Sequence, residues 1–139
     1  MIGILIVTHG QIGASLLESA SQIIDAVPRL TATLGVSRND DPDDLVLRVR
    51  RLVKQLDEGD GVLVLTDIFG ATPGNVIARI LEDGRVEGVS GLSLPMLLRV
   101  LTSREGTARD ALRGAVQRAL SGGADGVVHM NSDRCCDAQ

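Results

Sequence analysis

Short aliphatic runs alternate along this chain with longer segments of helical periodicity. Ile2–Val7 and Val62–Leu65 contain almost only large aliphatic side chains, which is typical of strands buried on both faces of a parallel sheet. Leu30–Val36 alternates aliphatic residues with threonines, and Arg85–Val89 has a weaker apolar pattern. We therefore expect four strands.

Between and after these runs, apolar residues recur at three- and four-residue steps, the spacing of one helix face. Two helix starts carry clear signals: Asp41 and Thr72 are expected caps, and each is followed by a proline at the first helical position. The expected helices cover Gln11–Val27, a segment from Pro42 that closes at 58–61, a segment after Thr72, Pro95–Leu101 and Thr107–Leu120, with Gly122 and Gly123 ending the last one.

Strands that alternate with helices through short connections predict parallel βαβ units. We therefore predict an α/β fold: a single doubly wound domain with a mainly parallel sheet of four strands and helices on both faces. Gly126–Met130 is expected to be a short last strand, so the domain would span residues 1–130. Residues 131–139 are expected to form a polar, flexible tail. The length of 139 residues fits one such domain.

Composition removes several classes of function. Phe69 is the only aromatic residue and the net charge is −4, which argues against nucleic-acid binding. No apolar stretch is long enough to span a membrane and no signal peptide is visible, so we expect a cytoplasmic protein. Cys135 and Cys136 are adjacent and are interpreted as reduced thiols in the tail.

No metal-ligand spacing and no nucleotide-binding motif occurs in the sequence, so we expect neither a metal nor a cofactor.

Polar side chains follow each of the first three predicted strands: Thr8-His9, Ser37-Arg38-Asn39 and Thr66-Asp67. His9 comes after the first strand and Asp67 after the third. If these strands are neighbours, the two side chains meet at the carboxyl edge of the sheet, where ligands bind in open α/β folds. An aspartate beside a histidine selects the ring tautomer and stabilises a positive imidazole, which leaves the far nitrogen as a nucleophile.

The loop after Asp67 is rich in small residues and leads into a helix. Its free N–H groups at Gly70, Ala71 and Thr72 would suit an oxyanion or a phosphate, and we add Thr66 to this candidate anion site. Taken alone, a histidine at a strand end is usually a surface residue; the combination points to a phosphoryl-accepting histidine. Because no nucleotide motif is present, another protein is the expected phosphoryl donor.

Two other groups of ionisable residues have simpler interpretations. His129 lies in the weak last strand and is interpreted as a structural or surface residue. Arg38, Arg99 and Arg104 could dock an acidic partner, although surface arginines are usually solvated.

Three segments carry a resemblance to a known family: 4–10, ending in Thr-His-Gly; 66–75, Thr-Asp-Ile-Phe-Gly-Ala-Thr-Pro-Gly-Asn; and 91–97, Gly-Leu-Ser-Leu-Pro-Met-Leu. They resemble the mannose-family enzyme IIA domain of the bacterial phosphoenolpyruvate-dependent sugar phosphotransferase system, and the resemblance extends to about Met130. It implies that His9 accepts a phosphoryl group from HPr and passes it to enzyme IIB, while Asp67 orients the ring.

The resemblance also implies a homodimer, in which 126–130 is a fifth, antiparallel edge strand contributed to the partner subunit. Contact with a membrane would be indirect, through a permease complex. The loop departs from the usual Gly-Gly-Ser-Pro followed by a bulky residue: Thr72 keeps a hydroxyl cap, and Gly74 removes a bulky side chain, so the partner surface should differ.

Two alternatives stay open at this point. No IIB domain follows in the chain, so IIB is either a separate protein or the chain is a regulatory phosphorelay or binding module without a transport role. The phosphotransferase subunit of dihydroxyacetone kinase is a related α/β domain, but the Gly-Ala-Thr-Pro loop fits it less well.

Overall fold

Four parallel strands form the sheet that organises this protein. The computed structural model describes residues 1–104 and 110–132. The strands are β1 (Gly3–His9), β2 (Thr31–Val36), β3 (Val62–Thr66) and β4 (Val86–Ser90), in the spatial order β2-β1-β3-β4. Each neighbouring pair is parallel. The prediction of a parallel α/β sheet is confirmed.

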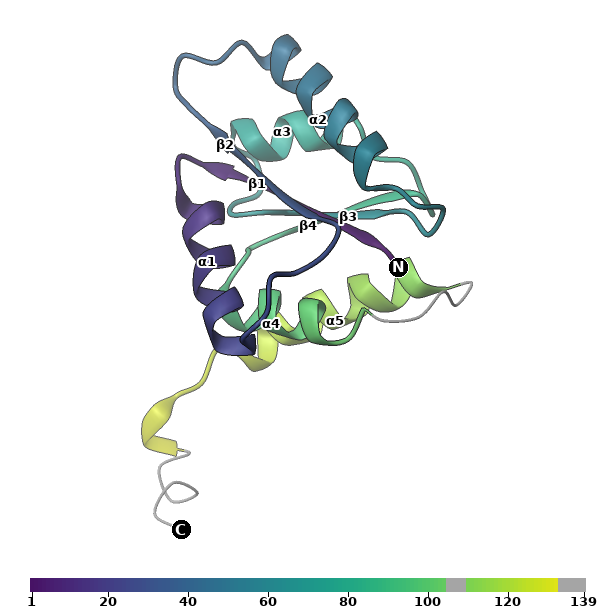
Figure 1. Cartoon of the computed structure of the whole chain (residues 1–139). Coiled ribbons are helices and arrows are strands. Elements are labelled where there is room, and N and C mark those ends of the chain that lie inside the picture. Colours follow the sequence, from purple (N-terminus) through teal and green to yellow (C-terminus); the bar gives the residue numbers. More distant parts are fainter. Residues whose placement is uncertain (105–109, 133–139) are drawn as a thin grey trace.

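Helices cover both faces of this sheet, as Figure 1 shows. On one face lie α2 and α3; on the other lie α1, α4 and α5. Their bounds are α1 (Ile12–Ile24), α2 (Pro42–Leu56), α3 (Thr72–Ala78), α4 (Leu94–Thr102) and α5 (Ala111–Asp125). The doubly wound arrangement is therefore confirmed.

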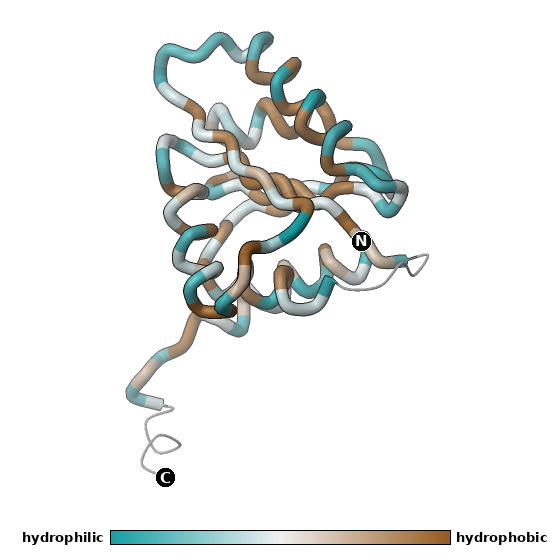
Figure 2. Tube along the Cα trace, viewed as in Figure 1, coloured by the Kyte–Doolittle hydropathy of each residue, from teal (hydrophilic) through white to brown (hydrophobic). Residues whose placement is uncertain are grey.

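The sheet separates two aliphatic cores. Successive side chains of a strand point to opposite faces. On β1, Leu5 and Val7 therefore join the core under α2 and α3, whereas Ile4 and Ile6 join the core under α1, α4 and α5. Figure 2 shows hydrophobic residues concentrated along the sheet. A strand with two buried faces needs an uninterrupted apolar run, which is the pattern seen in the sequence.

Helix starts agree with expectation at α2 but not at α3. The Asp41 carboxylate caps α2 by accepting from the Asp43 N–H at 3.1 Å. The expected cap at Thr72 is wrong. Helix α3 begins one residue earlier than expected, so Thr72 lies in its first turn and the cap position falls on Ala71, whose side chain has no oxygen to accept a bond.

Two other helix ends differ from expectation. Helix α1 stops at Ile24 because Asp25 adopts a left-handed conformation with φ of 54°. Helix α5 continues to Asp125, beyond the expected end at Gly122 and Gly123. A Cβ on Gly122 would press on Met96 of α4, so this glycine permits close helix packing and does not end the helix.

The predicted last strand, Gly126–Met130, is absent from the described chain. Gly126 follows α5 as a turn, residues 127–129 have no regular structure, and residues 130–132 form a helical turn. This segment leads away from the sheet in Figure 1, so no neighbouring strand is available to form a ladder with it. The expected antiparallel edge strand is therefore not shown by the described chain.

Some expectations concern residues that are not described. The first residues of the expected helix 107–120 and most of the expected tail, with Cys135 and Cys136, lie outside the described residues. Within residues 1–104 and 110–132, no helix is long and apolar enough to cross a membrane.

Candidate active site

Strand register brings His9 and Asp67 together at the carboxyl edge of the sheet. Strand β1 pairs with β3, with Val7 opposite Thr66, so the residues that follow emerge side by side. His9 Nδ1 lies 2.8 Å from Asp67 Oδ2, and the His9 backbone N–H donates to the same oxygen at 3.1 Å. The predicted proximity of these two side chains is confirmed.

The Asp67 carboxylate is held in its ionised form. Burial by itself raises the pKa of Asp67, but the hydrogen bonds from the His9 ring and backbone, and the charge of His9, outweigh it and leave the pKa below its usual value of 3.8. The second oxygen accepts from the Ile68 N–H at 3.1 Å and from the Thr66 hydroxyl at 3.4 Å. The carboxylate is therefore fixed on both sides.

An ionised carboxylate at Nδ1 determines the useful tautomer of His9. It can only accept, so Nδ1 carries the proton and Nε2 keeps a lone pair. The His9 side chain is 48% exposed, whereas that of Asp67 is 13% exposed. The arrangement can thus present a nucleophilic ring nitrogen to a reactant that arrives from solvent.

The backbone on either side of His9 is held tightly. Gly10 turns the chain with φ of 48°, and its N–H donates to the Val36 carbonyl at 3.0 Å. Gly35 of β2 lies so close to the Gly10 carbonyl oxygen that any Cβ would overlap it. The end of β2 therefore supports the turn that carries His9.

Thr8 is a site residue that sequence reasoning missed. Its side chain is buried, and its hydroxyl accepts from the Gly13 N–H at 2.8 Å and donates to the His9 carbonyl at 3.3 Å. It thereby links the end of β1 to the first turn of α1. The available signal was one hydroxyl at the end of an otherwise apolar strand, directly before the histidine.

A cleft of about 540 Å³ opens beside His9. It lies where the ends of β1 and β2 meet the starts of α2 and α3, and its lining residues are His9, Val36, Ser37, Arg38, Asp40, Pro42 and Thr72. Of the four residues predicted to bind an anion, Thr72 alone lines this cleft. Arg38, which the sequence placed at the polar end of the second strand and considered only for docking a partner, also lines the cleft.

The other predicted anion-site residues are placed differently from one another. Thr66 is buried, and its hydroxyl faces the Asp67 carboxylate. Gly70 and Ala71 lie in the loop before α3, and the N–H groups of Gly70, Ala71 and Thr72 donate to no acceptor within the described residues. The loop therefore keeps free donors, while Thr66 supports the carboxylate.

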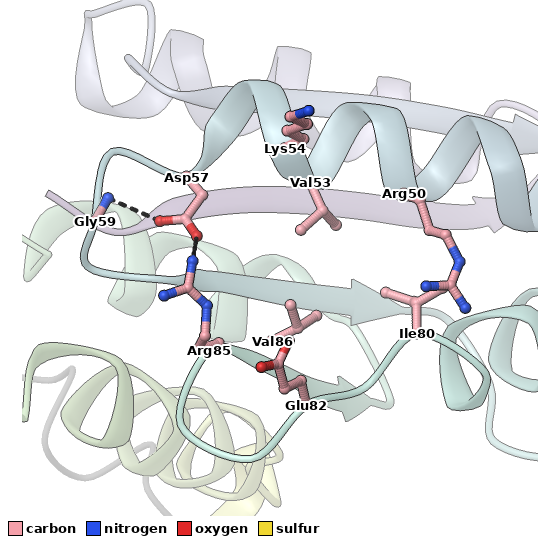
Figure 3. Close-up of a pocket in the computed structure, with 9 residues that line it drawn as sticks. All are labelled: Arg50, Val53, Lys54, Asp57, Gly59, Ile80, Glu82, Arg85 and Val86. Atoms are coloured by element: carbon pink, nitrogen blue, oxygen red, sulfur yellow. Dashed lines mark hydrogen bonds and ion pairs between the residues drawn. The ribbon is translucent and has the colours of Figure 1, made fainter.

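A second hollow, of about 550 Å³, lies at the opposite edge of the sheet, as Figure 3 shows. Val53, Ile80 and Val86 contribute aliphatic side chains, and an ion pair of 2.6 Å joins Arg85 to Asp57. Its lining residues include no histidine, cysteine or serine. Of these two hollows, the one beside His9 is therefore the one lined by a histidine side chain.

The remaining ionisable candidates lie away from the cleft. Arg104 is buried and donates to the Ile2 and Leu30 carbonyls, each at 3.2 Å, so it is neither a solvated surface arginine nor free to dock a partner. Burial and the nearby charge of Arg29 lower the pKa of Arg104. Arg99 is paired with Asp125 at 2.7 Å. Among the described residues, no group of three metal-binding side chains occurs.

Comparison with known proteins agrees with this fold. An α/β domain with a carboxylate-paired histidine at the carboxyl edge of its sheet is the class that the geometry defines. The family model of the PTS system fructose IIA component, EIIA-man, matches residues 3–117. The chain therefore belongs to this family of phosphotransferase-system IIA components, and the resemblance found in the sequence is confirmed.

Individual relatives support the same assignment. The chain is 36% identical over 106 residues to the PTS system fructose-specific EIIA component of Bacillus subtilis, covering 76% of this chain and 72% of that protein. It is 29% identical over 105 residues, 75% of this chain, to the mannose-specific EIIAB component of Escherichia coli K12, and spans 32% of that protein's length. The crystal structure of EIIA from Streptococcus agalactiae superposes with a TM-score of 0.81 at 27% identity, covering 95% of this chain and 99% of that one.

Proposed function

We propose that this protein is a phosphoryl carrier that accepts a phosphoryl group from phosphorylated HPr on His9 and passes it to an enzyme IIB partner during sugar uptake. The observation that supports this role is the 2.8 Å hydrogen bond between His9 Nδ1 and the Asp67 carboxylate. It leaves Nε2 of the half-exposed His9 ring as the acceptor atom. Membership in the EIIA-man family supports the same general reaction.

The transfer step balances without a cofactor. The Nε2 lone pair of His9 attacks the phosphorus of the donor phosphohistidine, and the P–N bond of the donor breaks as the new bond forms. The bonding pair returns to the donor nitrogen. Because Nδ1 keeps its proton, the phosphorylated ring becomes positive, and the ionised Asp67 stabilises that charge. Transfer to IIB repeats the step with His9 as the donor.

The loop before α3 is proposed to hold the phosphoryl oxygens. The N–H groups of Gly70, Ala71 and Thr72 are available as donors, and Thr72 lines the cleft beside His9. Thr66 contributes indirectly in this proposal, because its hydroxyl donates to the carboxylate that orients the ring. Oxyanions are well bound by such converging backbone donors.

A homodimer is proposed from an uncovered groove beside the edge strand β4. The groove, of about 360 Å³, is lined largely by apolar residues: Phe69, Ile77, Leu81, Val89, Val116 and Leu120. The segment 126–130 leads away from the body and exposes Val127, Val128 and Met130. We propose that this segment of a second copy covers the groove. Sedimentation should give a dimer for the full chain and a monomer after removal of residues 127–139.

The function is tested by phosphorylation in vitro. Phosphoenolpyruvate, enzyme I and HPr should give an acid-labile, base-stable phosphoryl label on the wild-type chain. The His9→Ala variant should take no label. The matched control is His129→Ala, which removes an exposed histidine whose ring Nδ1 lies 2.9 Å from the Ser132 hydroxyl, and it should label like wild type. Absence of label on wild type, or equal label on His9→Ala, contradicts the proposal.

The destination of the phosphoryl group is tested separately. A chase with a cognate IIB should remove the label from His9 faster than hydrolysis does. Loss by hydrolysis alone, with any IIB, would instead favour the regulatory alternative.

A further inference from the structure

The turn after β2 carries a basic side chain into the His9 cleft. Arg38 lies in a turn formed by Ser37–Asp40, in which the Asp40 N–H donates to the Ser37 carbonyl at 3.2 Å. The Ser37 N–H donates to the Asp40 carboxylate at 2.8 Å. Two hydrogen bonds therefore close this turn, and its backbone position does not depend on the Arg38 side chain.

The same turn is attached to the His9 turn. Strand register places Val36 opposite His9, and the Val36 carbonyl accepts from the Gly10 N–H at 3.0 Å. Arg38 follows Val36 by two residues and lines the cleft together with His9 and Thr72. The base of the Arg38 side chain and the reactive ring are thus parts of one connected structure.

The charges around the cleft favour a cation at this position. Asp67 contacts the His9 ring and Asp40 lines the cleft, so a phosphoryl dianion on His9 would be placed among carboxylates. Like charges at such separations repel unless a cation offsets them. Arg38 is the one lysine or arginine among the residues that line the cleft.

The Arg38 guanidinium is also available for a ligand. Its side chain is exposed, and within residues 1–104 and 110–132 it makes no hydrogen bond or ion pair. By contrast, Arg79, Arg85 and Arg99 are each paired with an aspartate. A guanidinium offers a planar fork of donors that matches two phosphoryl oxygens.

We propose that Arg38 is a phosphoryl-binding residue of this protein, which closes the cleft opposite the loop donors and stabilises the dianion held on His9. The proposal rests on the proposed phosphoryl-carrier function and adds to it a side chain outside the predicted anion site. Both the positive charge and the planar fork of the guanidinium contribute to binding the phosphoryl group in this proposal. A lysine at position 38 keeps the charge but not the fork, so it should retain only part of the effect.

The test uses a small phosphoryl donor, so that it does not depend on HPr. Phosphoramidate is used to phosphorylate His9 in a His129→Ala background, and the phosphoryl pKa is followed by ³¹P NMR. Arg38→Ala should raise this pKa by about 0.5–1 unit, because a neighbouring cation favours the dianion. Arg38→Lys should give a smaller rise. Arg48→Ala is the matched control on α2, outside the cleft lining, and should leave the pKa unchanged.

A second readout is the rate of transfer from phosphorylated HPr, where kcat/KM should fall about tenfold for Arg38→Ala. If wild type accepts the phosphoryl group and Arg38→Ala matches Arg48→Ala in both measurements, the Arg38 proposal is overturned while the carrier function stands. If phosphoramidate labels His9 but HPr does not, the assigned donor is wrong and the pKa series alone decides the role of Arg38. If neither reagent labels His9, both proposals are overturned.

Discussion

Each edge of the sheet has a largely buried aspartate, but the side chain that faces the carboxylate differs between the two edges. At the carboxyl edge Asp67 lies 2.8 Å from the His9 ring, and at the amino edge Asp57 lies 2.6 Å from the Arg85 guanidinium. The two aspartates are buried to a similar degree, with side chains 13% and 14% exposed. The hollows beside them are also similar in volume, about 540 and 550 Å³.

The side chain that faces each carboxylate makes the difference between the two pairs. A guanidinium has no lone pair to offer, so the Asp57–Arg85 pair can only hold structure. Asp57 also accepts from the Gly59 and Gly61 N–H groups, which closes the connection between α2 and β3. An imidazole held at Nδ1 keeps a lone pair on Nε2, so the same carboxylate chemistry supports a reaction at His9.

The largest expected effect separates these two carboxylates directly. Asp67→Asn should lower the rate of phosphoryl transfer to His9 on the order of 100-fold or more, because an amide neither fixes the tautomer nor stabilises the positive ring. Asp57→Asn is the matched control and should leave the rate unchanged. The rate is measured with phosphorylated HPr, with circular dichroism confirming the fold. Equal losses of transfer rate in the two variants would contradict the view that only the carboxylate beside His9 supports phosphoryl transfer.

A smaller effect is expected where β2 supports the His9 turn. In Gly35→Ala the added methyl group overlaps the Gly10 carbonyl oxygen, so the end of β2 or the His9 turn must shift. Such overpacking costs about 1–3 kcal/mol in the free energy of unfolding. Urea titration measures this loss. Gly84→Ala adds a methyl group in open space at a φ of 81°, a strain that Gly35→Ala does not carry, so it measures the cost of backbone strain without overlap at the amino edge.

The smallest expected effect is a pH dependence of stability that belongs to Asp67. Its folded-state pKa lies below the usual value of 3.8, so its contribution is present above that value and is lost as the pH falls through the lowered pKa. The difference in unfolding free energy between wild type and Asp67→Asn should be largest near neutral pH and shrink in this acidic range. Urea titrations at several pH values measure it, and a difference that stays constant into strong acid would contradict the lowered pKa.

Local pattern alone was enough to predict the α/β architecture. Aliphatic runs such as Ile2–Val7 can be recognised as strands from the sequence, because a strand buried on both faces has no polar position. The proximity of His9 and Asp67 was predicted on the condition that the first and third strands are neighbours, because parallel strands deliver their carboxyl ends to one edge.

Other features depended on contacts that no local pattern contains. Arg104 and Arg38 look alike in the sequence, yet one is buried against the Ile2 and Leu30 carbonyls and the other is exposed in the cleft. Gly122 resembles a helix end, but it lies inside α5 because α4 packs against it. The placement of Thr72 within α3, and not at its cap, also became clear only in three dimensions.

The sequence by itself thus determined the four strands of the sheet, the approximate positions of the helices, and the histidine and aspartate that follow the first and third strands, because periodicity and strand-end position are properties of short segments. The tertiary structure alone decided the order β2-β1-β3-β4, which makes His9 and Asp67 neighbours and brings the Arg38 turn to the same cleft. Strand order and burial arise from the packing of distant segments. Which side chains lie beside His9 at the carboxyl edge is therefore decided only by the assembled sheet.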